Sequence, residues 1–232
     1  MSSRPIARNS TPLANSVRRP AGVRELSAQA TRDGILRAAI KIFAKHGYSG
    51  GSVEKISKAA NSYDRMIYYY FGNKEGLFVA VLEEIYRRFN EAEAGLDLDI
   101  ERPVESLAEV IRFAFTYYQK HPEFITLLNS ENLHRGRHIG KSLRAREYSS
   151  PAIGTIDQLL RSGVTKGVFR ADVSARDLYV LIAAAGYFYQ SNRFTLSAFL
   201  GENLEAPAAF AHWEAFVKDI VIRAISAAPT TN

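Results

Sequence analysis

Apolar residues recur at intervals of three or four positions along most of the chain, which is the spacing that gathers them on one face of an α-helix. The first apolar stripe consists of Ile35, Ala39, Ile42 and Phe43. Thr31 can cap this helix at its start, and Gly47 is placed to end it. No segment shows the alternation of a half-buried strand, so the pattern predicts an all-α fold.

Eight further helices follow from the same periodicity and from the capping residues, prolines and glycines at their ends. Their expected ranges are 53–60, 64–71, 74–94, 103–120, 122–135, 141–162, 175–194 and 207–225. We expect an interruption at 149–151, inside the range 141–162, and a capping box of Ser174 and Asp177 ahead of residue 175. The fold therefore has about nine helices.

Two of these helices are separated by only three residues, Asn61-Ser62-Tyr63. Two short helices joined so tightly form a helix-turn-helix, and asparagine tolerates the left-handed backbone that such a turn requires. In the helix after the turn, Ile67, Tyr70 and Phe71 share one side. The opposite side carries Asp64, Arg65, Tyr68 and Tyr69. That side is expected to be exposed and to face the major groove of DNA.

Charge along the chain supports a polyanionic partner. Residues 1–74 hold 13 basic and four acidic side chains, a net charge of +9 against +6 for the whole chain. The rest of the chain is therefore mildly acidic. This distribution is typical of a protein that docks one end onto nucleic acid.

The residues expected to contact DNA are Ser52, Tyr63, Asp64, Arg65, Tyr68, Tyr69 and Lys74. Arginine can form two hydrogen bonds to guanine, while tyrosine hydroxyls reach phosphates and tyrosine rings meet thymine methyl groups. Lys74 lies at a helix start, where backbone N–H groups also favour a phosphate. For Asp64 two roles stay open: accepting from a cytosine amino group, or stabilising the helix N-terminus.

Two stretches, Ile56–Ala60 and Met66–Phe78, resemble the signature of the TetR family of bacterial transcriptional regulators. The resemblance is specific over residues 31–80, and it implies a DNA-binding regulator that dimerises and responds to a small molecule. The family usually has Gly-Val in the turn where this chain has Asn61-Ser62. It often has Ser-Lys-Gly where this chain has Tyr63-Asp64-Arg65, so the operator sequence of a relative cannot be transferred.

The chain is expected to have four parts. They are a disordered basic arm (1–30), a helix-turn-helix domain (31–78), a helical regulatory and dimerisation domain (79–227) and a frayed tail (228–232). The arm is either a solvated tail or a segment that follows DNA phosphates or enters the minor groove.

Aromatic residues interspersed with polar ones in the C-terminal part fit either a packed core or a ligand pocket. The expected ligand-binding residues are Phe113, Tyr117, Phe124, Glu131, His134, Tyr187 and Arg193. The rings would stack on an aromatic effector, and Arg193 or His134 would pair with a carboxylate. His134 and His138 have metal-ligand spacing, but adjacent arginines favour a solvated helix end, so no metal is expected.

Small residues in the eighth helix and an apolar stripe in the last predict a homodimer, built as a four-helix bundle from two copies of these helices. The expected interface residues are Ala183, Gly186, Trp213, Phe216 and Ile220. Part of the stripe must pack on its own subunit.

Several classes of function are excluded by what the chain lacks. It has no cysteine, which rules out disulfides and thiolate zinc sites. No nucleophile elbow, phosphate loop or dinucleotide fingerprint is present, so neither an enzyme nor a cofactor is expected. The longest apolar run is too short for a membrane span, which favours a cytoplasmic protein.

The sequence therefore predicts a homodimeric repressor that is released from a palindromic operator, in double-stranded DNA, by a small-molecule inducer. Two alternatives remain open. One is a DNA-binding regulator of the same fold without a small-molecule ligand; the other is a binding module or enzyme whose basic end recruits an acidic partner.

Overall fold

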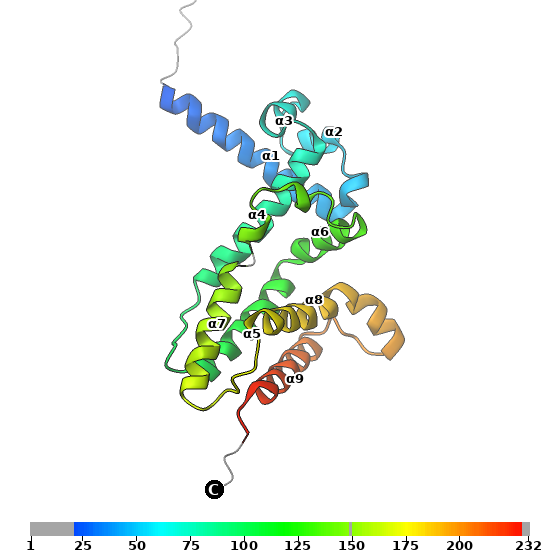
Figure 1. Cartoon of the computed structure of the whole chain (residues 1–232). Coiled ribbons are helices and arrows are strands. Elements are labelled where there is room, and N and C mark those ends of the chain that lie inside the picture. Colours follow the sequence, from blue (N-terminus) through cyan, green and yellow to red (C-terminus); the bar gives the residue numbers. More distant parts are fainter. Residues whose placement is uncertain (1–20, 149, 229–232) are drawn as a thin grey trace, which may run out of the picture.

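The computed structural model describes residues 21–148 and 150–228, and over these residues the chain is all-α (Figure 1). The helices are α1 (Ala21–Gly50), α2 (Val53–Ala59), α3 (Asp64–Phe71), α4 (Lys74–Ala94), α5 (Pro103–Lys120), α6 (Pro122–Leu133), α7 (Ser150–Thr165), α8 (Ala175–Leu200) and α9 (Pro207–Ile225). Two 3₁₀ turns, η1 (Ile139–Lys141) and η2 (Ala145–Glu147), lie between α6 and α7. The described part contains no β-strand, only an isolated bridge between Phe169 and Ser226. The all-α prediction is confirmed.

Local signals explain most helix ends. The side chains of Ser52, Asn73 and Ser174 each accept a hydrogen bond from a backbone N–H in the first turn of α2, α4 and α8. The helices α5, α6 and α9 begin with proline, which has no N–H to leave unsatisfied there. Gly47 adopts φ 66° and breaks α1, so the predicted stop at this residue is confirmed.

The predicted start of the first helix at Thr31 is wrong, because α1 begins at Ala21. Thr31 donates its hydroxyl to the carbonyl of Ser27, one turn back, as a residue inside a helix does. Residues 25–30 are exposed, so this extension has no apolar stripe, although Ala, Gln, Glu and Leu favour helix. The prediction of a disordered arm over 1–30 fails for 21–30, and residues 1–20 lie outside the described part.

Two further boundaries differ from the prediction. The helix expected from residue 141 begins at Ser150, because the two short 3₁₀ turns precede it. The turn η1 packs on α4 and η2 on α7, and Ser142 between them donates to Glu83 of α4. The helix α8 continues six residues beyond Phe194 to Leu200 and ends at Gly201, which adopts φ 69°. Its last turns are exposed, so the buried stripe ends before the helix does.

The helices form an elongated molecule with α1–α3 at one end and α8 and α9 at the other, while α4 runs between the two ends (Figure 1). One buried cluster joins Ile35 of α1 and Phe78 of α4 to Tyr117 of α5 and Ile125 of α6. A second cluster joins α5, α7, α8 and α9. The apolar core is thus continuous across the expected boundary at residues 78 and 79. No helix in the described ranges is long and apolar enough to cross a membrane.

Candidate DNA interface and effector cavity

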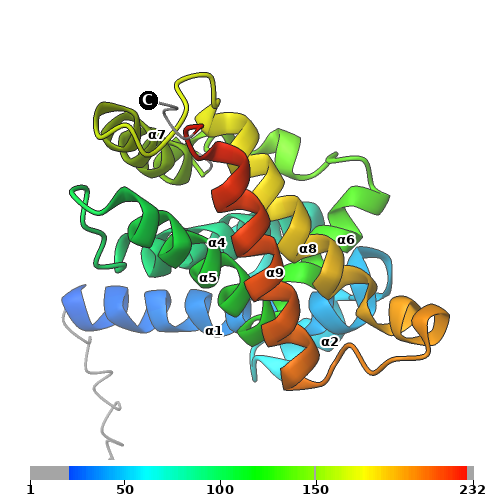
Figure 2. The same ribbon diagram turned by 90° about the horizontal axis from the view of Figure 1, so that it is seen from below.

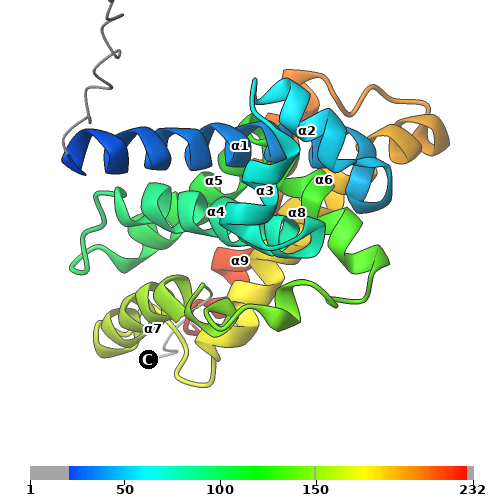
Figure 3. The ribbon, with the colours of Figure 1, turned by 90° about the horizontal axis from the view of Figure 1, so that it is seen from above.

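The turn between α2 and α3 is fixed by backbone geometry. Asn61 adopts φ 48°, as predicted for this position, and Ser62 donates its N–H to the carbonyl of Ser57 at 2.9 Å. Ile67 is fully buried and anchors α3 on the core. A Cβ on Gly51 would lie 2.5 Å from the Phe43 ring, so only glycine lets α2 approach α1 this closely. The helix α3 packs on α1, α2 and α4 (Figure 3).

The outward side of α3 has the composition expected of a reading surface. Asp64, Arg65, Tyr68 and Tyr69 are all exposed, so the predicted orientation of this helix is confirmed. Tyr63, Tyr68 and Tyr69 expose 70%, 53% and 77% of their surface. The Arg65 guanidinium lies 5.0 Å from the centroid of the Tyr63 ring, within the range of a cation–π contact. Three exposed tyrosine rings beside an arginine offer both stacking and hydrogen-bonding groups to a partner.

Three of the expected DNA-contacting residues also have structural partners. Asp64 accepts a hydrogen bond from the Ser57 hydroxyl and so ties α3 to α2. Ser52 accepts from the N–H of Lys55 at 3.2 Å. Lys74 Nζ donates to the carbonyl of Ser49 at 3.3 Å, and its partial burial lowers the pKa of its ammonium group.

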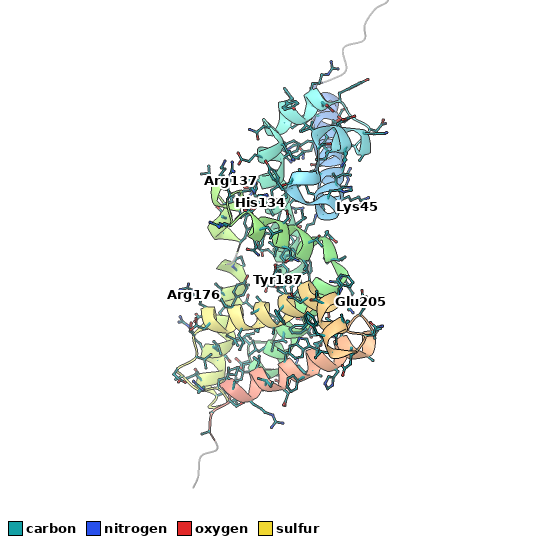
Figure 4. The ribbon with its side chains drawn as sticks, turned by 90° about the vertical axis from the view of Figure 1, so that its right-hand side faces the viewer. Lys45, His134, Arg137, Arg176, Tyr187 and Glu205 are labelled. Atoms are coloured by element: carbon teal, nitrogen blue, oxygen red, sulfur yellow. The ribbon has the colours of Figure 1, made fainter. Side chains whose placement is uncertain are left out.

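Basic side chains are also exposed on the two helices that precede α3. Lys41, Lys45, Lys55 and Lys58 are exposed on α1 and α2, and Lys45 points outward from α1 (Figure 4). Such side chains neutralise phosphates without reading the base sequence.

A cavity of about 310 Å³, which we call the α4–α8 cavity, opens between α4, α5, α6 and α8. Its lining consists of Tyr86, Phe89, Tyr118, Phe124, Leu128, Asn132, Tyr148, Tyr179, Val180, Ala183, Ala184 and Tyr187. Phe124 and Tyr187 are the two expected ligand-binding residues in this lining. Burial raises the pKa of Tyr86 to about 12 and raises that of Tyr118 further, so their hydroxyls stay protonated at neutral pH.

The other five expected ligand-binding residues lie elsewhere. Phe113 and Tyr117 line a separate hollow of about 280 Å³ next to His121. Arg193 donates to the carbonyl of Gln190, lies over the Phe194 ring and comes within 3.8 Å of Glu205.

Glu131 and His134 lie where α6 and the segment after it pack against α1. The buried Glu131 carboxylate accepts from the backbone N–H of His138 and of Ile139, at 2.7 and 2.9 Å. It also lies 2.6 Å from Nδ1 of the His138 ring, which packs on Tyr48 of α1. His134 contacts the same tyrosine ring and lies well apart from Tyr187 (Figure 4). Of the seven expected ligand-binding residues, only Phe124 and Tyr187 therefore line the α4–α8 cavity.

Sequence periodicity could not separate these sites, because it identifies the buried face of a helix but not which neighbouring cavity that face meets. The helical spacing of apolar residues over 74–94 places Tyr86 and Phe89 on the buried face of α4, but it gives no reason to select Tyr148 or Tyr179. Tyr148 follows the η2 turn, and its ring stacks on Tyr86 at 5.6 Å. No periodic signal marks such a position.

Three of the expected dimer-interface residues have neighbours within their own chain, as was expected for part of the stripe. A Cβ on Gly186 would lie 3.0 Å from the Tyr118 ring of α5. Trp213 stacks on Tyr189 and donates its indole N–H to the carbonyl of Ala185 at 3.3 Å. Ala183 lines the α4–α8 cavity.

Phe216 and Ile220 remain exposed by 48% and 45%, as an interface requires. Leu181 and Phe188 of α8 are also exposed apolar side chains. The helices α8 and α9 lie side by side (Figure 2).

The tight turn, the exposed side of α3 and the exposed lysines of α1 and α2 define a helix-turn-helix regulator that binds DNA. A sequence model described as bacterial regulatory proteins of the tetR family matches residues 35–81, and one described as the tetracyclin repressor-like C-terminal domain matches residues 103–221. The chain belongs to the TetR family of transcriptional regulators.

Individual relatives agree with this assignment. The chain is 48% identical over 207 residues to the HTH-type transcriptional repressor NicS of Pseudomonas putida, covering 89% of this chain and 98% of that protein. It is 26% identical to the HTH-type transcriptional regulator RutR of Escherichia coli, over 88% and 94% of the two chains.

Solved structures share the fold. A TetR transcription regulator from Haloarcula marismortui matches with a TM-score of 0.65 and 19% identity, over 86% of this chain and 99% of that chain. The putative transcriptional regulator SCO4942 from Streptomyces coelicolor matches with a TM-score of 0.62 and 22% identity, over 84% and 98%.

Proposed function

We propose that this chain is a homodimeric repressor that binds a palindromic operator and is released from it by a small molecule. The observation that carries the proposal is the exposed side of α3, where Arg65 stands among Tyr63, Tyr68 and Tyr69. These groups suit direct contact with bases and phosphates in the major groove. A repressor of this kind acts on the chromosome, in the cytoplasm.

Dimerisation would use the outer faces of α8 and α9. The exposed side chains Leu181, Phe188, Phe216 and Ile220 give each protomer an apolar face, and two such faces would close a four-helix bundle. A two-fold dimer presents two copies of α3 to adjacent major grooves, so the operator would be palindromic.

Release would follow from a ligand in the α4–α8 cavity. Tyr86 and Phe89 of the cavity belong to α4, whose N-terminal turn follows α3 directly. A ligand that binds the DNA-free form more tightly would shift the protein away from the DNA-binding form; one that binds both forms equally would shift nothing. The presence of this cavity supports a ligand-responsive repressor over a regulator without a ligand.

The experiment is a gel-shift titration of the protein against the DNA flanking its own gene, at fixed salt. We expect a specific complex that competitor DNA of scrambled sequence does not remove. Absence of any specific complex would contradict the proposed function and favour a module that binds an acidic protein.

A further inference from the structure

We propose that the α4–α8 cavity is built for an organic cation, either a quaternary ammonium group or a protonated nitrogen heterocycle. This inference rests on the proposed effector function, because it names the chemical class of that effector. It replaces the aromatic carboxylate expected from the sequence, since neither Arg193 nor His134 lines the cavity.

Aromatic rings form most of the cavity wall. The seven rings belong to Tyr86, Phe89, Tyr118, Phe124, Tyr148, Tyr179 and Tyr187. Several of them pack closely; Tyr86 and Phe124 meet edge to face at 5.5 Å, and Phe89 stacks on Phe124 at 5.6 Å. The faces of aromatic rings carry partial negative charge, and cages of such rings attract cations, most strongly where water is excluded.

No Lys, Arg or His side chain belongs to this lining, so nothing in the wall would neutralise a carboxylate. Arg144 lies 5.9 Å from the centroid of the Tyr148 ring; both residues line a second hollow beside α1, and only Tyr148 also lines the α4–α8 cavity. The hydroxyl of Tyr187 donates to Asn129 and is therefore directed away from a bound anion.

The charged groups that act on Tyr86, Tyr118 and Tyr179 are acidic. Burial is the main cause of the raised pKa of each, and Glu93 adds to the rise for Tyr118 and Tyr179 and Glu131 to that for Tyr86. Tyr148 has both Arg144 and glutamates as charged neighbours. The carboxylates of Glu93 and Glu131 would attract a cation in the cavity and repel an anion. The carboxylates and the ring faces therefore both favour a positively charged ligand.

Glu93 does not line the cavity, but it acts electrostatically on Tyr118 and Tyr179, which do, and a bound cation would favour its ionised form. It is buried on α4, one turn beyond Phe89, with the hydroxyls of Tyr118 from α5 and Tyr179 from α8 as its titratable neighbours. Burial raises the pKa of its carboxyl group to about 7, so the group is partly protonated at neutral pH. A nearby cation favours the ionised form, so cation binding would release a proton to solvent.

The test compares three probes of similar shape and different charge by titration calorimetry on the full chain, without DNA. They are phenyltrimethylammonium, its neutral isostere tert-butylbenzene, and benzoate. We expect phenyltrimethylammonium to bind about tenfold more tightly than tert-butylbenzene, as a cation–π contribution of one to two kcal/mol requires, and benzoate to give no measurable binding. Titrations in two buffers of different ionisation enthalpy should reveal the released proton.

Two variants and a control test whether the cation binds in the α4–α8 cavity. Phe124→Leu keeps an apolar side chain but removes a ring, so it should weaken phenyltrimethylammonium about fivefold and leave tert-butylbenzene nearly unchanged. Phe199→Leu, which removes an exposed ring at the end of α8, is the matched control and should change neither. Glu93→Gln should weaken the cation alone and abolish proton release.

Equal affinity for the cation and its neutral isostere would overturn the proposal, as would tighter binding of benzoate or no heat with any probe. Operator binding is measured separately by gel shift. A cation that binds in calorimetry but leaves the operator complex intact would support the cation site and contradict the ligand-released repressor.

Discussion

The residues expected to contact DNA differ in their surroundings, although their spacing in the sequence groups them together. Arg65 and Tyr69 project into solvent, whereas Asp64 accepts a hydrogen bond from Ser57 and Lys74 contacts the ring of Tyr48 at 4.6 Å. The periodicity of α3 was sufficient to predict which residues are exposed, because that depends only on where the apolar residues lie. It could not predict that Asp64 would be held by α2.

The substitution Arg65→Ala should weaken binding to the specific operator by about 1–3 kcal/mol and relax selectivity at one base pair. Tyr68→Phe should weaken it less, because only a hydroxyl is lost. Both should unfold at the same temperature as the parent, since both side chains are exposed. Fluorescence anisotropy with labelled operator variants measures this, and parent-like affinity for both proteins would rule out the assigned surface.

Lys74→Ala should weaken specific and non-specific DNA alike and reduce the salt dependence of binding by about one phosphate contact. Lys218→Ala on α9, at the opposite end of the molecule, is the control. A loss confined to one DNA sequence would show that Lys74 reads bases.

The buried carboxyl group of Glu93 should make stability depend on pH. Its pKa is raised from 4.5 to about 7, so the unfolded chain loses this proton at lower pH than the folded chain does. Stability should therefore fall as pH rises from about 4.5 to about 7, and the contribution of this group should then stay constant.

Glu93→Gln should remove this fall and stabilise the protein above pH 7 by up to about 3 kcal/mol relative to the parent, with little difference near pH 4. Urea unfolding across that pH range is the measurement. Glu91→Gln, an exposed change on the same helix, should stay within about 0.5 kcal/mol of the parent throughout. Parallel pH profiles for the parent and Glu93→Gln would contradict the raised pKa.

At the scale of elements, the segment between α6 and α7 connects the two ends of the molecule. Lys141 Nζ pairs with Glu75 of α4 at 2.7 Å, and Ser142 donates to Glu83 of the same helix. Glu131 holds the start of this segment against α6. The sequence predicted a helix here because it contains no strong breaker before Pro151. Polar contacts to other helices decided the conformation instead, and such contacts leave no periodic signal.

Replacing Glu131 by alanine should destabilise the fold by about 3 kcal/mol, because the backbone N–H groups of His138 and Ile139 would be left buried without an acceptor. Equilibrium unfolding in urea measures the loss. Glu123→Ala, a half-exposed change on the same helix, should lose less than about 1 kcal/mol. Equal effects of the two substitutions would show that the buried carboxylate contributes no more than an exposed one.

At the scale of the whole molecule, the α8–α9 face decides the oligomeric state. Phe216→Glu and Ile220→Glu should each place a charge in the proposed interface and yield monomers in sedimentation velocity at micromolar concentration. Leu133→Glu alters an exposed apolar residue of α6 and should leave the dimer intact. A parent protein that sediments as a monomer would refute the dimer itself.

The cluster of buried side chains that joins α1 and α4 to α5 and α6 limits how this chain can be recombined with its relatives. Phe43 and Phe78 touch Tyr48, whose ring meets His134 and His138 from beyond residue 130. A chimaera that exchanged only the first 81 residues would place a foreign surface against those histidines. Changing the operator preference by grafting therefore requires either the few exposed residues of α3 alone, or a donor segment long enough to bring its own α6.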